Sequence, residues 1–244
     1  MAAVKAMAVA TRQEFDLVVS SAKWCDDEFS FEAATQLAEF LSEQNYVNNA
    51  VARNWNETFD DCACQFKNWF DVRTFYGVNL CESSFTFAST RFCYSTEFQK
   101  CHIEQPWLTC ESNSDSWNLI NWTGRYLSKD SRRLWKRALE KVDPQRTKFI
   151  GFQEEHRRFT EMCGTEYERV EAKTFSDAAR FVAKANRLYS NQSALLAVAQ
   201  GMGLPVTVEV SSKWPDCIFL RDGAEYLPKN KKRDLENGLN WGVQ

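Results

Sequence analysis

The sequence contains little histidine, glycine and proline. Only 2 histidines, 9 glycines and 5 prolines occur among 244 residues, whereas 34 aromatic residues are spread along the chain. This composition excludes disordered, collagen-like and low-complexity chains, and it supplies little for histidine-rich metal chemistry. No apolar run approaches the roughly 18 residues that a membrane span needs, and the mildly apolar N-terminus is too short for a signal peptide. We therefore expect a soluble, cytoplasmic protein.

Two phosphate-binding motifs are also missing. Neither the dinucleotide fingerprint GxGxxG nor the phosphate loop GxxxxGKS/T occurs in the sequence. In the first motif, glycines bring the backbone close to a pyrophosphate, and in the second the loop and its lysine hold a nucleotide triphosphate. Their absence argues against dehydrogenases and P-loop NTPases.

The nine cysteines are odd in number and irregularly spaced. They stand at positions 25, 62, 64, 81, 93, 101, 110, 163 and 217. Disulfide frameworks are dense in much shorter chains and pair completely. A zinc site needs paired ligands, and Cys62-Ala63-Cys64 and Cys101-His102 each lack a second pair. We expect reduced, mostly buried thiols and no metal site.

The net charge of −3 hides an asymmetry between the two halves. Residues 1–115 carry 8 Lys and Arg against 17 Asp and Glu, whereas residues 116–244 carry 22 against 16. The densest basic run, residues 125–148, holds nine Lys and Arg and three acids. This asymmetry predicts two lobes with different ligands, the basic lobe being the place for phosphate. The basic run alone is equally compatible with a solvated helix face.

The second half alternates between strand and helix patterns. Strands are predicted at 117–122, 148–152, 167–170, 188–190, 206–210 and 218–220. Helices are predicted at 131–142 and 154–162, after a capping box at Thr174–Asp177, and at 194–202, where Gly203 and Pro205 end an almost entirely apolar segment. Repeated units of this kind give a parallel sheet covered by helices.

The first half is less regular. It contains a strand candidate at Phe15–Ser20, a helix capped by Ser30, and a second strand candidate at 46–52. The apolar residues Phe31, Ala34, Leu37 and Leu41 are predicted to face inward from that helix. Further helices are predicted at 60–70 and within 75–108. A polar stretch near residue 113 marks the boundary between the lobes, and residues 228–244 form a polar tail.

Three segments resemble a known family. Residues 187–205, RLYSNQSALLAVAQGMGLP, combine a strand, a small polar turn and a buried Ala-rich helix. Residues 149–159, FIGFQEEHRRF, form a strand, a glycine and an acidic helix, and residues 121–126, NWTGRY, form an opening loop. Together they resemble heptosyltransferase-like glycosyltransferases of phage and bacteria. Residues 37–47 and 105–108 resemble connecting pieces of the same family.

This resemblance implies a two-lobed α/β fold of the GT-B type with a shortened N-terminal lobe. Residues 1–113 would be the acceptor-side Rossmann-like lobe and residues 114–227 the lobe that binds the nucleotide-sugar donor. The implied activity is metal-independent transfer of a sugar to a hydroxyl of a glycan or a modified DNA base, with no tightly bound cofactor. The chain departs from the family at Trp122, where an arginine is expected, and before Phe15, where a strand and a glycine-rich loop are expected.

The resemblance and the physics of phosphate binding also nominate donor-site residues. They are Thr123, Arg125, Gly151, Glu155, Ser190, Asn191, Gln192, Ser193 and Glu209. The turn Ser190–Ser193 opens a helix at the carboxyl end of a strand, where unpaired backbone N–H groups attract anions.

Each of these assignments has a structural alternative. Ser193 can simply cap its helix, and Arg125 can form a surface salt bridge instead of gripping phosphate. Glu155 and His156 either contact the nucleoside or begin an exposed helix. Glu209 either binds a ribose hydroxyl or braces a loop.

The general base is predicted in an acidic segment of the first half. Asp26, Asp27 and Glu28 follow the first predicted strand and are the candidates, although a solvated acidic loop has the same composition. A non-catalytic nucleotide- or sugar-binding module is therefore the alternative function. Another nucleotide-using enzyme on a similar doubly wound sheet is a third possibility, because fold does not fix function.

Overall fold

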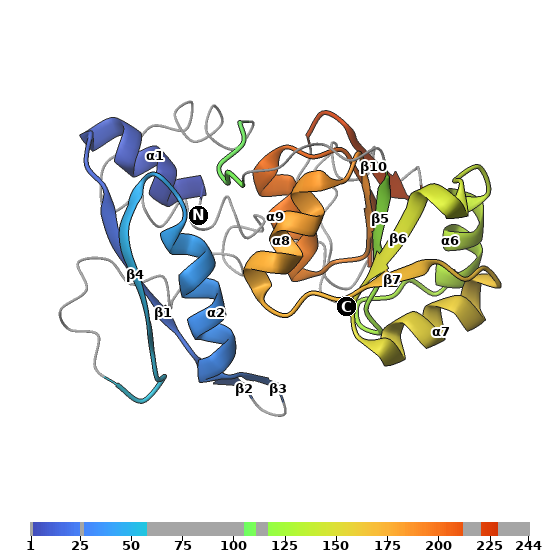
Figure 1. Ribbon diagram of the computed structural model, residues 1–244, viewed down its shortest axis with the longest axis horizontal. Coiled ribbons are helices and arrows are strands. Elements are labelled where there is room, and N and C mark those ends of the chain that lie inside the picture. Colours follow the sequence, from blue (N-terminus) through green and yellow to red (C-terminus); the bar gives the residue numbers. More distant parts are fainter. Residues whose placement is uncertain (1, 25–26, 58–104, 111–116, 212–220, 229–244) are drawn as a thin grey trace, which may run out of the picture. The chain divides into compact units, whose positions relative to one another are not determined.

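The computed structural model describes residues 2–24, 27–57, 105–110, 117–211 and 221–228. The chain divides into two compact units (Figure 1). Unit 1 comprises residues 1–109 and 174–177, and unit 2 comprises residues 110–173 and 178–244.

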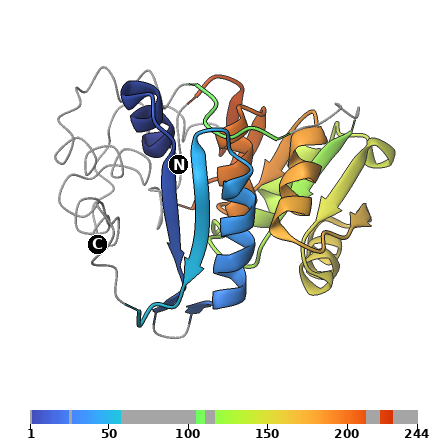
Figure 2. The ribbon, with the colours of Figure 1, turned by 60° about the vertical axis from the view of Figure 1, so that its left-hand side comes forward.

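Unit 1 is built around one parallel strand pair and its crossover helix. The strands β1 (Phe15–Ser20) and β4 (Val47–Arg53) pair in parallel, and α2 (Phe31–Ser42) lies beside them in both views (Figure 2). A short antiparallel hairpin, β2 (Ala22–Trp24) and β3 (Asp27–Phe29), is inserted between β1 and α2. The Ser30 side chain accepts a hydrogen bond from the Ala33 amide at 3.1 Å. Both predicted strands and the Ser30 cap are confirmed.

Other expectations for unit 1 were only partly confirmed. Ala34 and Leu41 of α2 are buried as predicted, and Leu37 is half-buried, but Phe31 is 46% exposed; Ala38 and Phe40 complete the inward face. An additional helix, α1 (Ala2–Thr11), precedes β1, and its Val4, Ala6 and Ala8 are buried. Residues 105–108 are not helical. The helices predicted at 60–70 and 75–104 lie outside the described residues.

Unit 2 contains a six-stranded parallel sheet in the order β10-β9-β8-β5-β6-β7. The strands are β5 (Asn118–Asn121), β6 (Thr147–Ile150), β7 (Glu168–Val170), β8 (Leu188–Ser190), β9 (Val206–Glu209) and β10 (Ala224–Leu227). Counted from β5 along the chain, this is the Rossmann order 3-2-1-4-5-6. The prediction of a mainly parallel, doubly wound sheet that starts near Trp117–Trp122 is confirmed.

Helices cover both faces of this sheet. The helices are α6 (Ser131–Leu139), α7 (Gln153–Cys163), α8 (Phe175–Lys184) and α9 (Ala194–Met202), with a short 3-10 helix, η2 (Pro144–Arg146), before β6. Figure 1 shows α6 and α7 on one face, and α8 and α9 on the other. Under α6 and α7 lies an aromatic core, in which the Trp135 and Phe159 rings meet edge to face with centroids 5.1 Å apart.

The helix ends follow the local sequence signals. Thr174 and Asp177 exchange side-chain to backbone hydrogen bonds, at 3.1 and 3.2 Å, at the start of α8. Gly203 ends α9 with φ of 77°, a left-handed conformation that favours glycine. The strand predicted at 218–220 lies outside the described residues. The edge strand β10 was not predicted, because its short sequence AEYL buries only Tyr226.

Candidate functional site

The order of strands in unit 2 reverses between β5 and β8. In doubly wound sheets, ligands bind outside the carboxyl ends of the strands at such a switch point. Here β5 ends at Asn121 and β8 ends at Ser190, and these two residues are direct partners in the strand pairing. The loops that follow them, residues 122–126 and 191–193, therefore form the candidate site.

Asn121 ties together three strand ends at the switch point. Its side-chain amide donates to the Ile150 carbonyl at 2.9 Å, at the end of β6. Its Oδ1 accepts from the Ser193 hydroxyl at 2.7 Å and lies 3.5 Å from the Ser190 hydroxyl. The residue is buried. This network fixes the position of the turn that opens α9.

Asn191 holds the loop after β5 against the loop after β8. Its Oδ1 accepts from the Thr123 amide at 3.0 Å, and its Nδ2 donates to the carbonyls of Thr123 and Arg125 at 2.9 and 2.7 Å. The side chain is fully buried. Because both ends of the amide are bonded to the loop backbone, the loop is preorganised.

The first turn of α9 provides donors for an anion. The Ser193 hydroxyl accepts from the Leu196 amide at 3.2 Å, and the Ser193 carbonyl accepts from the Ala197 amide. The first backbone bond within α9 runs from the Ala197 amide, so the amides of Ala194 and Leu195 have no carbonyl partner inside the helix, as at every helix start. Both the cap and the anion site predicted at Ser193 are therefore compatible with the observed turn.

Arg125 and Gln192 belong to the same pair of loops. Arg125 is exposed, and its guanidinium carbon lies 5.8 Å from the centroid of the Tyr126 ring. Gln192 is buried, and its Oε1 accepts from the Ser211 amide at 2.8 Å. Of these two, Arg125 is the residue with a charged group at the surface of the site.

Glu155 and His156 have structural partners at the end of β6. Glu155 Oε2 accepts from the Phe152 amide at 3.0 Å and so caps α7. His156 Nε2 lies 2.8 Å from the Tyr167 carbonyl oxygen, which can only accept, so Nε2 carries the proton. The Gly151 carbonyl accepts from Arg169 at 3.3 Å. These contacts are compatible with the structural alternative for the start of the acidic helix. A nucleoside role for Glu155 or His156 and a donor-site role for Gly151 stay predictions.

Glu209 accepts four hydrogen bonds from the start of α6 and the segment before it. Oε1 accepts from the amide and hydroxyl of Ser128, both at 2.8 Å. Oε2 accepts from the Ser131 hydroxyl at 2.9 Å and the Trp135 indole at 2.6 Å. The side chain is fully buried. Glu209 is thus a loop-bracing carboxylate, and a ribose contact would require one of these donors to be displaced.

The candidate bases belong to unit 1. Asp27 and Glu28 lie in β3, opposite Trp24 and Lys23 of β2. Asp26 lies outside the described residues. Their role as general base stays a prediction.

The sequence did not single out Asn121 or Arg158. The Trp122 side chain, which stands where an arginine was expected, is buried in the aromatic core with its indole N–H unpaired. The Arg158 guanidinium lies 5.7 Å from the Trp122 ring centroid, and a β-carbon at Gly124 would come within 2.9 Å of its Nη1. Glycine at 124 therefore lets a cation from α7 lie against the loop after β5.

Metal and membrane features are absent from the described part of the chain. Within it, no three His, Cys, Asp or Glu side chains are grouped to hold a metal ion. Nor does any helix there have the length and apolar character to cross a membrane. Of the nine cysteines, the structure describes Cys110 and Cys163, both half-buried.

No protein-family model and no curated protein sequence matches this chain. Among solved structures, the E. coli heptosyltransferase WaaC with ADP is similar, with a TM-score of 0.54 and 11% identity over 97% of this chain and 95% of that chain. A family 9 glycosyl transferase from Veillonella parvula has a TM-score of 0.41 and 10% identity, over 100% of this chain and 71% of that chain. The likeness to the first structure confirms the predicted fold class, a mixed α/β fold with parallel sheets as in GT-B glycosyltransferases.

Proposed function

We propose that this protein is a glycosyltransferase that moves a sugar from a nucleotide-sugar donor to an acceptor hydroxyl. The observation that carries the proposal is the preorganised pair of loops at the switch point of a Rossmann-ordered sheet. The structural similarity to the heptosyltransferase with ADP supports it at the level of the fold. The nucleotide diphosphate would lie against the turn Ser190–Ser193.

In this mechanism a carboxylate of the chain takes the proton from the acceptor hydroxyl. The hydroxyl oxygen then bonds to the anomeric carbon, while the bond from that carbon to the diphosphate oxygen breaks. The negative charge that develops on the diphosphate is stabilised by the Arg125 guanidinium and by the backbone N–H groups at the start of α9. With these donors in place, the transfer needs no metal ion.

Acceptor and base complete the proposal. The base is one of Asp26, Asp27 and Glu28, and the acceptor is a hydroxyl on a glycan or on a modified DNA base. The donor-site loops hold the leaving group, whereas the base fixes which hydroxyl reacts. No tightly bound cofactor takes part.

A thermal-shift series tests the donor site directly. UDP, GDP, ADP and CMP and their sugar conjugates are each added to the full chain. A ligand that binds only the folded state raises the melting temperature with its occupancy. We expect stabilisation by one nucleoside diphosphate and by its sugar conjugate. If none of these ligands shifts the melting temperature at millimolar concentration, the donor-site assignment is wrong.

The second candidate is a non-catalytic nucleotide- or sugar-binding module. It is favoured by one observation: the two donor-lobe carboxylates predicted to contact the nucleotide, Glu155 and Glu209, are both engaged by the protein itself. The two functions differ in turnover. An enzyme slowly hydrolyses its bound nucleotide-sugar to the free diphosphate even without an acceptor, whereas a binding module returns the donor intact.

A further inference from the structure

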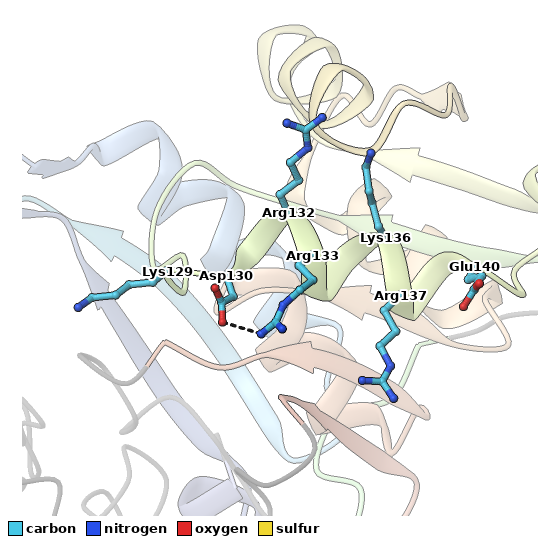
Figure 3. Close-up of a pocket in the computed structure, with 7 residues that line it drawn as sticks. All are labelled: Lys129, Asp130, Arg132, Arg133, Lys136, Arg137 and Glu140. Carbon is cyan, nitrogen blue, oxygen red and sulfur yellow. Dashed lines mark hydrogen bonds and ion pairs between the residues drawn. The ribbon is translucent and has the colours of Figure 1, made fainter.

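The exposed face of α6 is a dense cationic surface. Figure 3 shows its side chains, which line a cavity of about 720 Å³. We define the α6 basic face as Lys129, Arg132, Arg133, Lys136 and Arg137; Asp130 and Glu140 are the two acids beside it. All five cations are exposed. The face therefore carries five positive charges against two negative ones.

Carboxylates in the described part of the chain neutralise few of these cations. Arg133 pairs with Asp130 at 2.8 Å, between side chains that are 77% and 62% exposed, so the pair is weak. Within the described residues, none of Arg132, Lys136 and Arg137 lies in an ion pair. The apolar side of the same helix, with Leu134, Trp135 and Leu139, is buried. The cations are thus held outward on a helix that the core anchors.

The composition of the face restricts the kind of partner. No large apolar side chain of α6 is exposed, so the face lacks both the aromatic anchors of protein interfaces and the apolar residues that insert into a bilayer. It also presents no exposed aromatic side chain, which single-stranded nucleic acids use for base stacking. What remains is a surface that can contact only negative charge.

The arrangement of the cations matches a regular polyanion. Arg132 with Lys136 and Arg133 with Arg137 form two rows at i and i+4 spacing, and Figure 3 shows one row above the helix ribbon and the other below it. Since adjacent helix positions are only about 100° apart around the axis, the two rows flank a single exposed face. Within a row, the cations are about 6 Å apart along the axis. A nucleic acid duplex presents about one charge per 1.7 Å of its axis, so both rows can meet phosphates at once. Arginine, which contributes three of the five cations, binds phosphate through two parallel hydrogen bonds.

We propose that the α6 basic face binds the phosphate backbone of double-stranded nucleic acid without sequence preference. The inference does not depend on the proposed glycosyl transfer, because duplex binding and nucleotide binding are measured separately. Where transfer to a DNA base also holds, the face would keep the duplex on the enzyme.

Fluorescence anisotropy with a labelled 20-base-pair DNA duplex tests the proposal. The test variant combines Arg132→Gln, Lys136→Gln and Arg137→Gln. The matched control combines Arg12→Gln, Lys173→Gln and Lys184→Gln, which removes the same charge from residues that are not part of the α6 basic face. Each protein is titrated between 50 and 200 mM salt, after its melting temperature has shown that it is folded. A further variant, Glu140→Gln, removes one of the two acids beside the face.

We expect the wild-type chain and the control to bind the duplex alike. The test variant should bind at least about tenfold more weakly at 50 mM salt, and its slope of log affinity against log salt should be shallower by about 3. Glu140→Gln should bind more tightly than the wild-type chain. Equal losses in the control and test variants, or no duplex binding by the wild type, would overturn the proposal. So would binding to vesicles containing 30% phosphatidylserine without binding to the duplex.

Discussion

The indole N–H of Trp135 donates to Oε2 of Glu209 over 2.6 Å, although the two residues are 74 positions apart in the sequence. Trp135 lies on α6 and Glu209 ends β9, so this bond joins the first crossover helix of the sheet to its fifth strand. Three further donors, from Ser128 and Ser131, complete the shell of the carboxylate. This buried cluster fixes the start of α6, and with it the loop that carries Arg125.

Glu209→Gln should destabilise the protein. The amide places an NH₂ group against either the Ser128 amide or the Trp135 indole, and neither of these donors can accept. A buried donor left without an acceptor costs about 1–3 kcal/mol, so we expect the free energy of unfolding to fall by about 2 kcal/mol or more. Urea unfolding measures this, with the exposed Glu140→Gln as the control. If Glu209→Gln is as stable as that control, the four hydrogen bonds contribute little.

The fold of unit 2 was largely predictable because its signals are local. The capping box at Thr174 and the glycine at 203 mark helix ends through contacts within a few residues. The apolar segment after Ser193 is buried, as its composition requires. Alternation of such helices with short apolar strands is sufficient for a parallel sheet.

The candidate site was less predictable because its contacts are distant in sequence. Ser193 meets Asn121 across 72 positions, and Asn191 meets Thr123 across 68. The sequence placed these residues at strand ends but gave no sign that they bond to one another. The same holds for Glu209. From the sequence, a carboxylate at a strand end can either bind a ribose hydroxyl or brace a loop. Only the folded structure shows that Ser128, 81 positions away, donates to it.

Asn191→Asp should release the loop after β5. The substitution replaces Nδ2, which donates to the carbonyls of Thr123 and Arg125, by an oxygen that repels both. We expect a lower melting temperature and weaker binding of the nucleoside diphosphate that stabilises the wild type. Asn186→Asp, at an exposed position between α8 and β8, is the matched control. Unchanged nucleotide affinity in Asn191→Asp would mean that this loop takes no part in the donor site.

The Cys163 thiol should be unreactive in the folded protein. Burial raises its pKa from 9.0 to about 12, an effect partly offset by the nearby charges of Lys136 and Arg132. Since the thiolate is the reactive form, iodoacetamide at pH 8 should leave Cys163 unmodified while it labels the urea-unfolded chain. Peptide mass spectrometry reads out this one residue among the nine cysteines.

The raised pKa of Cys163 also predicts how the free energy of unfolding changes with pH. Below about pH 9 the thiol is protonated in both the folded and the unfolded state, so Cys163 adds no pH dependence to the free energy of unfolding. Between about pH 9 and 12 the unfolded chain releases the proton and the folded chain keeps it, so the free energy of unfolding decreases as pH rises. Cys163→Ala should lose part of this alkaline decrease. If the variant and the wild type show identical pH profiles, the burial of this thiol has no energetic effect.

Arg125→Ala should weaken nucleotide binding without unfolding the protein. The side chain is exposed, so its removal leaves the core intact. Loss of a charged hydrogen bond costs about 1.5–3 kcal/mol, which is roughly a 10- to 150-fold rise in Kd. Arg125→Lys keeps the charge but not the paired donors of a guanidinium, and it should fall between the wild type and the alanine variant. Calorimetric titration with the stabilising nucleoside diphosphate measures all three proteins.

The control for Arg125 is another arginine of the same basic run, located at the opposite end of the strands. Arg146 is exposed and directly precedes β6, so it lies at the amino end of the strands, whereas Arg125 follows the carboxyl end of β5. Arg146→Ala removes the same charge from the run and should leave nucleotide affinity unchanged. If both alanine variants lose affinity equally, the effect comes from net charge. If neither variant does, Arg125 has no part in holding the diphosphate, and the turn Ser190–Ser193 would have to bind it through backbone donors alone.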